Sequence, residues 1–198
     1  MFTGIITAQG QLTHRERLGA DRQLSVATPA GFTKGIRVGD SIAVNGVCLT
    51  VTARRLRQLQ FVLSPETLAK TTLGEKPIGT LLNLEKALRF GATLDGHLVA
   101  GHVDGVGTLR LLKKVSHSWH VEFAAPKALH KFLAVKGSIT VDGVSLTINK
   151  LTRHGFTVML IPHTQQATNF SALRVRQRVH LEVDLLARYV ERLLRQRR

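Results

Sequence analysis

The chain repeats itself at a constant offset of 97 residues. Residues 38–51 align without a gap with residues 135–148, and 8 of the 14 positions are identical. The same offset pairs Leu84-Glu85 with Leu181-Glu182. A unit of this length is too long for a solenoid repeat and has the size of a small domain. The repeat therefore predicts two copies of one fold in tandem.

Within each copy, short runs rich in Val, Ile, Leu, Thr and Phe alternate with turn residues. Asn45-Gly46 separates two such runs and favours the type I′ turn of a hairpin, and Asp142-Gly143 has the equivalent place in the second copy. Further strand candidates are 23–28, 60–63, 81–84, 106–112, 119–124, 156–161 and 179–183. Because closing a sheet removes its exposed edges, this pattern favours an antiparallel β-barrel in each copy.

Helical segments are fewer. Short helical turns are expected at 65–73 and 126–133. After Asp184, a candidate N-cap, the sequence predicts a C-terminal amphipathic helix with Leu186, Val190 and Leu193 on one stripe. This stripe either packs back on a barrel or joins the same helix of other subunits in a small bundle.

The chain is strongly basic, with 28 Lys and Arg against 13 Asp and Glu and a formal net charge of +15. Segments 1–97, 98–173 and 174–198 each carry +5, so the charge forms no concentrated basic tail. A nucleic-acid binder would interleave aromatic side chains with Arg and Lys along a strand, whereas this chain has only eight Phe, one Trp and one Tyr. We therefore expect a solvated basic surface and no nucleic-acid partner.

Cysteine use and hydropathy suggest a location. Cys48 is the only cysteine, which excludes an internal disulfide, and no Cys and His residues have the paired spacing of a structural zinc site. The start of the chain lacks a basic leader followed by an apolar stretch, and no segment approaches the roughly 20 apolar residues of a membrane span. The sequence predicts a cytoplasmic protein without a membrane partner.

Four motifs in order resemble riboflavin synthase of the α-chain type. They are Met1-Phe-Thr-Gly-Ile5, the duplicated Gly-Val-(Cys/Ser)-Leu-Thr, Gly96-His-Leu-Val-Ala-Gly-His-Val-Asp104 and Leu185-Leu-Ala-Arg-Tyr-Val-Glu-Arg-Leu193. Each motif is weak alone, but together they cover nearly the whole chain. The resemblance implies a mainly β protein with two tandem six-stranded Greek-key antiparallel barrels, 1–97 and 98–184. Each barrel would bind one lumazine, and a C-terminal oligomerisation helix, 185–198, would join subunits in a homotrimer.

The resemblance also implies a reaction, the dismutation of two molecules of 6,7-dimethyl-8-ribityllumazine. One molecule gives up a four-carbon unit and the other receives it, which yields riboflavin and 5-amino-6-ribitylamino-2,4-pyrimidinedione without a metal or redox cofactor. A duplicated domain suits this reaction, because two similar pockets that face each other can hold two identical substrates at contact distance.

Chemistry is expected where the two copies differ. Three aligned pairs are the first candidates: Cys48 and Ser145, Glu66 and His163, and Ile5 and His102. The resemblance assigns catalytic roles to five residues: Phe2, Ser41, Cys48, His102 and Asp184. His102 has the intrinsic pKa to take a proton from the acidic 7-methyl group of the donor lumazine.

Other interpretations of these residues stay open at the level of sequence. Cys48 is either a small buried hydrophobe or a polarisable or nucleophilic group beside the ring. Phe2 either contacts the reacting centre or covers a barrel mouth, and Ser41 either activates a water or hydroxyl nucleophile or simply begins a strand. Asp184 is either only an N-cap or, as the resemblance implies, also an acid near the site, and His97 is either a site residue or a surface histidine.

The resemblance implies two substrate pockets. The first would be lined by Gly4, Ile5, Ile6, Cys48, Leu49, Thr50, Val62, Leu63, Ser64, Pro65, Glu66 and Thr67. The second would be lined by Gly101, His102, Val103, Lys136, Ser145, Leu146, Thr147, Met159, Leu160, Ile161, Pro162, His163 and Thr164. Backbone amides and hydroxyls suit a flat heterocycle with alternating donors and acceptors.

The main alternative to an enzyme is a lumazine or flavin carrier with the same fold. Such carriers can lose part of the opening or second-site motif, whereas Phe2, Ser41, Cys48 and His102 are all present here. The chain departs from the family pattern at 168–178, where expected glycines are missing and a loop must differ. The sequence therefore favours the enzyme.

Overall fold

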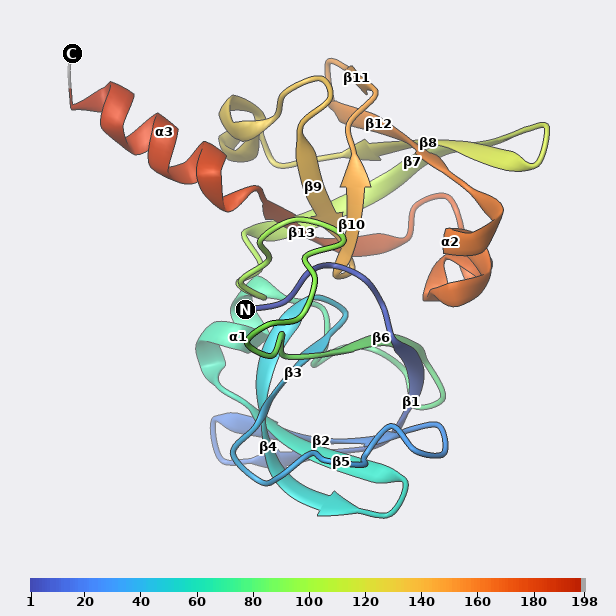
Figure 1. Cartoon of the computed structure of the whole chain (residues 1–198), viewed down its shortest axis with the longest axis vertical. Coiled ribbons are helices and arrows are strands. Elements are labelled where there is room, and N and C mark those ends of the chain that lie inside the picture. The colour runs from blue at the N-terminus through green and yellow to red at the C-terminus, as the bar shows by residue number, and fades with distance from the viewer. Residues whose placement is uncertain (197–198) are drawn as a thin grey trace.

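Two β-barrels, one from each copy of the repeat, stack along the long axis of the molecule, and a C-terminal helix projects from the second (Figure 1). The computed structural model describes residues 1–196. The N-terminus lies where the barrels meet (Figure 1). This mainly β architecture confirms the predicted fold class.

The first barrel is closed, with strand order β1-β2-β5-β4-β3-β6. Its elements are β1 (Ala8–Leu18), β2 (Asp21–Ala27), β3 (Ser41–Val44), β4 (Val47–Arg55), β5 (Gln58–Leu63), α1 (Pro65–Lys70) and β6 (Leu81–Lys86). Apolar side chains from alternate strand positions fill the interior, as Leu24, Val51 and Phe61 do.

The second sheet has the order β10-β9-β13-β7-β8-β12-β11. Its elements are β7 (Gly105–Val115), β8 (Ser118–Ala124), the 3-10 helix η1 (Lys127–Phe132), β9 (Ser138–Val141), β10 (Val144–Thr147), β11 (Lys150–Leu151), β12 (Gly155–Leu160), α2 (Pro162–Ala167), the 3-10 helix η2 (Asn169–Ala172) and β13 (Arg178–Val183). Each strand from β7 to β10 begins 97 residues after its counterpart in the first barrel.

One strand position of the second barrel differs from the first. β10 and β11 together occupy the place of β4, and they form the two ends of the seven-stranded sheet. The interruption follows Thr147, where Ile148 N donates to Gly137 O and Asn149 N donates to Thr157 O. The second copy therefore forms a seven-stranded sheet with β10 and β11 at its ends, whereas the resemblance implied a six-stranded barrel.

The C-terminal helix α3 (Leu185–Arg195) confirms the predicted amphipathic helix, although residues 197–198 lie outside the described residues. Asp184 caps it, since its Oδ1 accepts a hydrogen bond from Leu186 N at 2.9 Å. The apolar stripe is uncovered, with Leu186 64% and Leu193 63% exposed. Within residues 1–196, no helix has the length and apolar character needed to cross a membrane.

A buried polar network of Asn45, Asn83, Asp142, Asn169 and His180 joins the two barrels. Asn83 of β6 joins the two hairpin turns. Its Nδ2 donates to Asp142 O at 3.0 Å, and its backbone N donates to Asn45 Oδ1 at 2.6 Å. Asn169 N donates to Asn83 Oδ1 at 2.7 Å, and His180 N donates to Asp142 Oδ1 at 2.8 Å. Since all five residues are buried, these hydrogen bonds fix the relative position of the barrels.

His180 makes this network sensitive to pH. Burial lowers the pKa of His180 against the opposing effect of Asp142, and Nε2 accepts from Thr72 N at 2.9 Å, as only the neutral ring can do. The unfolded chain therefore takes up this proton at higher pH than the native protein, so stability is lost as pH falls below about 6.5.

We expect the contribution of His180 to the free energy of unfolding in urea to be smaller at pH about 5.5 than at about 7.5, and comparison with a variant that lacks the ring separates it from other titrating groups. A His180→Gln variant, which keeps an acceptor near Thr72 N without a titrating ring, should lose much of this dependence. The exposed His154→Gln variant is the control and should retain it. Equal pH dependence in wild type and His180→Gln would contradict the assignment.

Candidate active site

The candidate residues of the two hairpins lie on the outer faces of the barrels. Leu49 and Val51 are buried in the first core, so strand alternation turns Cys48 and Thr50 outward. The same alternation turns Ser145 outward on β10, with Leu146 in the second core. Of the predicted lining residues, Leu49, Leu63, Leu146 and Leu160 therefore have core side chains and offer only backbone groups to a ligand.

Each barrel is covered by a segment from the other repeat. We call residues 1–7 the first crossing segment and residues 98–104 the second. Ser145 N of the second barrel donates to Gly4 O at 2.8 Å, and Cys48 N of the first donates to Gly101 O at 2.8 Å. The sequence placed Gly4 with Cys48 and Gly101 with Ser145, and the structure exchanges these partners.

Glycine is required where each segment crosses. Gly4 has φ +77° and Gly101 has φ +79°, which is left-handed backbone that other residues rarely adopt. A Cβ on Gly101 would lie 2.7 Å from Cys48 Cβ, and one on Gly4 would lie 2.7 Å from Ser145 Cβ. The crossing segments therefore lie in direct contact with the hairpins.

The first site is a cavity of about 270 Å³ beside the half-buried thiol of Cys48. It is lined by Val47, Cys48, Glu66, Thr67, Lys70, Thr71, Gly101, His102 and Val103. Phe2 packs against Cys48 next to this cavity: the ring is fully buried with Val99, Ala43 and Cys48, and Phe2 N donates to Val99 O at 2.7 Å. Phe2, Cys48 and His102, three predicted catalytic residues, are thus brought together.

The second site has the same frame with different side chains. Ser145 Oγ lies 2.7 Å from His97 Nδ1, and burial lowers the pKa of His97 while the charge of Asp184 opposes this effect. Asp184 is therefore near His97 as well as being the cap of α3. His97, which the sequence left open between site and surface, therefore contacts the predicted pocket residue Ser145.

Because the crossing segments are exchanged, the three aligned pairs that differ between the repeats divide between the two sites. The first site contains Cys48, Glu66 and His102, and Lys70 of α1 lines it as well. The repeat places Ser145, His163 and Ile5 at the equivalent positions of the second site, with Ala167 in place of the lysine. The first site therefore has a thiol and a lysine where the second has a hydroxyl and an alanine.

Other predicted residues lie at the margins. Ser41 lines a separate cavity of about 200 Å³ with Lys86 and Arg89, although its strand partner is Thr50. Lys136 is exposed in the turn before β9. The exposed or partly exposed remainder follows the outer strands and the helices after them: Ile6, Val62, Ser64, Pro65, Thr147, Met159, Ile161, Pro162 and Thr164.

Two buried carboxylates that the sequence did not single out hold the crossing segments. Glu85 accepts from Thr3 N at 2.7 Å and Gly4 N at 3.0 Å, and Glu182 accepts from Ala100 N at 2.7 Å and Gly101 N at 3.0 Å. Burial raises the pKa of both, that of Glu182 to about 7. The alignment of Glu85 with Glu182 in the repeat was the sequence feature that could have identified them.

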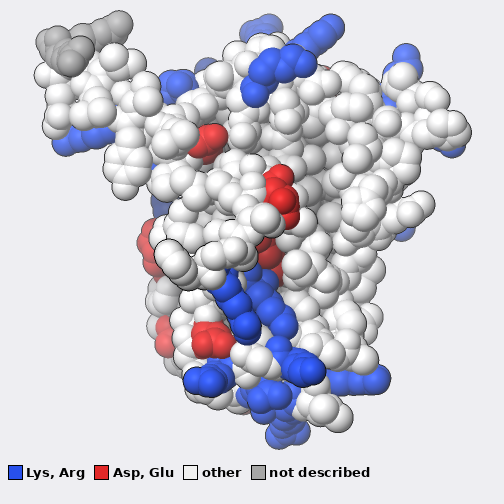
Figure 2. Space-filling view, in the orientation of Figure 1, with Lys and Arg blue, Asp and Glu red and all other residues white. Residues whose placement is uncertain are grey.

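The surface charge is unevenly distributed on the face shown in Figure 2. Basic side chains are most numerous over the first barrel, with acidic side chains among them toward the middle of the molecule. Within residues 1–196, no three His, Cys, Asp or Glu side chains are grouped as a metal site.

Both repeats match one family model, the lumazine binding domain, over residues 3–87 and 100–184. The chain also resembles the crystal structure of LumP complexed with riboflavin, with a TM-score of 0.86 and 23% sequence identity. That match covers 92% of this chain and 99% of LumP, and it shows the shared fold.

Similarity to curated relatives extends over nearly the whole chain. A riboflavin synthase of Mycobacterium tuberculosis (strain ATCC 25618 / H37Rv) is 44% identical over 201 residues, which cover 98% of each chain. Riboflavin synthases of Photobacterium phosphoreum and Bacillus subtilis (strain 168) are 40% and 39% identical, and each match covers 98% of this chain and about nine-tenths of the relative. With the duplicated lumazine binding domain, this similarity shows that the chain belongs to the riboflavin synthase family.

Proposed function

We propose that the chain is a riboflavin synthase that converts two molecules of 6,7-dimethyl-8-ribityllumazine into riboflavin and 5-amino-6-ribitylamino-2,4-pyrimidinedione. One observation carries this proposal: two sites share a backbone frame but differ in reactive side chains, with Cys48 and His102 at one and Ser145 and His97 at the other. A dismutation needs this combination, because two identical molecules must be bound alike and treated differently.

The first site has the groups for proton transfer. His102 lies on the second crossing segment and lines the cavity with Cys48 and Glu66. We assign to His102 the removal of a proton from the 7-methyl group, since imidazole exchanges protons near neutral pH. Cys48 is the neighbouring polarisable or nucleophilic group, and the buried ring of Phe2 packs against it.

The second site holds the other lumazine between Ser145 and His97. Their 2.7 Å contact and the nearby Asp184 orient the imidazole. Ser41 would act only on a substrate that extends along the outer face past Thr50, its strand partner. Both sites would contact the heterocycle through outward hydroxyls and free backbone groups.

Mixing the purified protein with 6,7-dimethyl-8-ribityllumazine and following absorbance tests this function. We expect riboflavin to form, and we expect Cys48→Ala and His102→Gln each to lower kcat by about 100-fold. His117→Gln, in the turn between β7 and β8, is the matched histidine control and should retain activity. Tight binding without product would indicate a carrier, and neither binding nor product would overturn the proposal.

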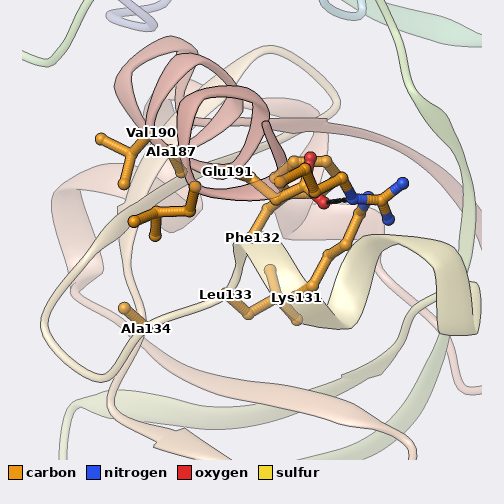
Figure 3. Close-up of a pocket in the computed structure, with 9 residues that line it drawn as sticks. Lys131, Phe132, Leu133, Ala134, Ala187, Val190 and Glu191 are labelled. Atoms are coloured by element: carbon orange, nitrogen blue, oxygen red, sulfur yellow. Dashed lines mark hydrogen bonds and ion pairs between the residues drawn. The ribbon is translucent and has the colours of Figure 1, made fainter. Parts of the chain in front are cut away.

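We infer that the protein assembles as a homotrimer through α3. The helix presents Leu186, Val190 and Leu193 to solvent, and beside it lies a groove of about 670 Å³. Figure 3 shows Ala187 and Val190 on the helix side of this groove, opposite Leu133 and Ala134, with Lys131 bonded to Glu191. Apolar surface of this kind on a projecting helix favours burial against other copies.

In this proposal, barrels 1–97 and 98–184 each bind one substrate molecule, and segment 185–198 mediates assembly. We place the enzyme in the cytoplasm, which suits a chain whose one cysteine is a free thiol.

Introducing a charge into the apolar stripe is expected to separate the subunits. Val190→Asp places a carboxylate where an apolar contact between helices would form, a desolvation cost of several kcal/mol. Size-exclusion chromatography with light scattering should give a monomer mass for Val190→Asp and a trimer mass for wild type. Arg192→Ala, at an exposed position of the same helix, should remain a trimer. A trimeric Val190→Asp would contradict the role of α3.

A further inference from the structure

We propose that Glu182 is a positioning residue of the first site: it holds the second crossing segment, and with it His102, against Cys48, and helix α3 tunes this contact through Arg188. The role in catalysis rests on the proposed function, but the contact itself belongs to the ligand-free protein. Because Glu182 lies outside the cavity that contains Cys48, it acts through backbone and not on substrate.

The geometry connects Glu182 to Cys48 through one residue. Its two carboxylate oxygens accept from Ala100 N and Gly101 N, and Gly101 O accepts in turn from Cys48 N. Glu182 is 4% exposed, so these amide hydrogen bonds do not compete with bulk water. Losing them frees Gly101 and the adjacent His102 to move away from the hairpin.

The charged groups around Glu182 come from two other elements. Asp104, at the end of the second crossing segment, raises the pKa of Glu182, although less than burial does, and Arg188 of α3 lowers it. Arg188 also holds Asp104, with its Nη2 2.8 Å from Oδ1 and 2.9 Å from Oδ2. Glu182, Arg188 and His102 line one cavity of about 340 Å³, so the helix is in position to keep the carboxylate ionised.

Protonation is expected to loosen the contact. With a pKa of about 7, Glu182 is largely ionised one unit above neutrality and largely protonated one unit below it. The amide hydrogen bonds from Ala100 and Gly101 lower the pKa of Glu182. When the segment moves off a carboxyl that stays buried in β13, this pKa is therefore higher still, and protonation favours the loosened state. The second crossing segment should therefore be held less firmly as pH falls through about 7.

The first crossing segment is a built-in comparison. Glu85 holds Thr3 and Gly4 against Ser145 in the same way, but the other barrel is involved. Substituting Glu85 removes an equivalent buried carboxylate but keeps the hydrogen bonds from Ala100, Gly101 and Cys48, so it reaches Cys48 only through the packing of Phe2. An effect that both substitutions share indicates general loosening of the crossing segments. An effect seen only on substituting Glu182 indicates the contact between the second crossing segment and Cys48.

Cys48 is the only thiol, so its modification reads out the segment directly. We would measure the rate of reaction of the ligand-free protein with 4,4′-dithiodipyridine between pH about 6 and 8.5, relative to glutathione, which corrects for thiol ionisation. In wild type the relative rate should rise as pH falls through about 7. In Glu182→Gln it should be about tenfold above wild type at high pH and independent of pH, whereas Glu85→Gln should accelerate the reaction far less and keep the rise as pH falls through about 7.

Arg188→Met provides a second test that keeps the carboxylate. Removing the cation raises the pKa of Glu182 further, so the rise in labelling should move to higher pH, while Arg192→Met should leave it in place. A wild-type rate in Glu182→Gln, equal acceleration in Glu85→Gln, or an unmoved profile in Arg188→Met would overturn the proposal. Because labelling needs no substrate, a protein that forms no riboflavin but shows these rates would refute the proposed function alone.

Discussion

Gly101→Ala is expected to abolish riboflavin formation, with kcat/KM at least about 100-fold below wild type. The new methyl group would lie 2.7 Å from Cys48 Cβ and 3.0 Å from Phe2 Cε2, two groups without room to move. The backbone would also have to hold φ +79° with a side chain. The second crossing segment must therefore shift, and His102 shifts with it.

Steady-state riboflavin formation measures this effect, and lumazine binding by fluorescence separates lost affinity from lost chemistry. Gly31→Ala is the matched control, because Gly31 has φ +82° but nothing within 4 Å of an added Cβ. It bears the same backbone cost without the clash, so it should retain activity. An active Gly101→Ala enzyme would show that the close crossing is unnecessary.

Asn83→Ala should be the most destabilising of the substitutions proposed here, at about 3–4 kcal/mol. Its side chain donates to Asp142 O and Asn169 Oδ1 and accepts from Asn169 N, all in the buried network between the barrels. Truncation leaves these groups without partners and without access to water. For a chain of this size the loss corresponds to roughly 10 °C in thermal midpoint.

Differential scanning calorimetry checks this value. Asn149→Ala is the control, because Asn149 uses its backbone N–H toward Thr157 O and lies outside the buried network. Its effect should stay below about 1 kcal/mol. A similar loss of stability in both variants would mean that the hydrogen bonds of Asn83 in the network contribute no more to stability than those of an asparagine outside it.

The repeat made most of the fold predictable. Apolar alternation located the hairpin strands, and Asn45-Gly46 and Asp142-Gly143 form the expected turns. β1 was missed because its outer half, from His14 to Leu18, is polar and largely exposed, although its counterpart in the second copy was found. The constant offset would have recovered it. The break between Thr147 and Lys150 has no equivalent in β4, so the repeat did not predict it.

The site was predictable in content but not in arrangement. The sequence identified Cys48, His102 and Phe2, and the structure brings them together, while their catalytic roles stay predictions. It did not show which barrel each crossing segment would cover, because periodicity within a strand carries no information about contacts between repeats. Glu182 was missed for a related reason: a buried glutamate in a strand resembles a tolerated polar residue until its amide partners are known.

The exchange of crossing segments bears on how such a chain could arise. A single 97-residue unit would lack the segment that completes its own site, so separate units could work only as a mutually swapped dimer, which dissociates on dilution. Joining two units makes that association intramolecular, at an effective concentration on the order of millimolar. Fusion also allows the two sites to differ in sequence, which the symmetry of a homodimer does not. In a swapped homodimer any mutation appears at both sites, whereas the fused chain can keep a thiol at one and a hydroxyl at the other.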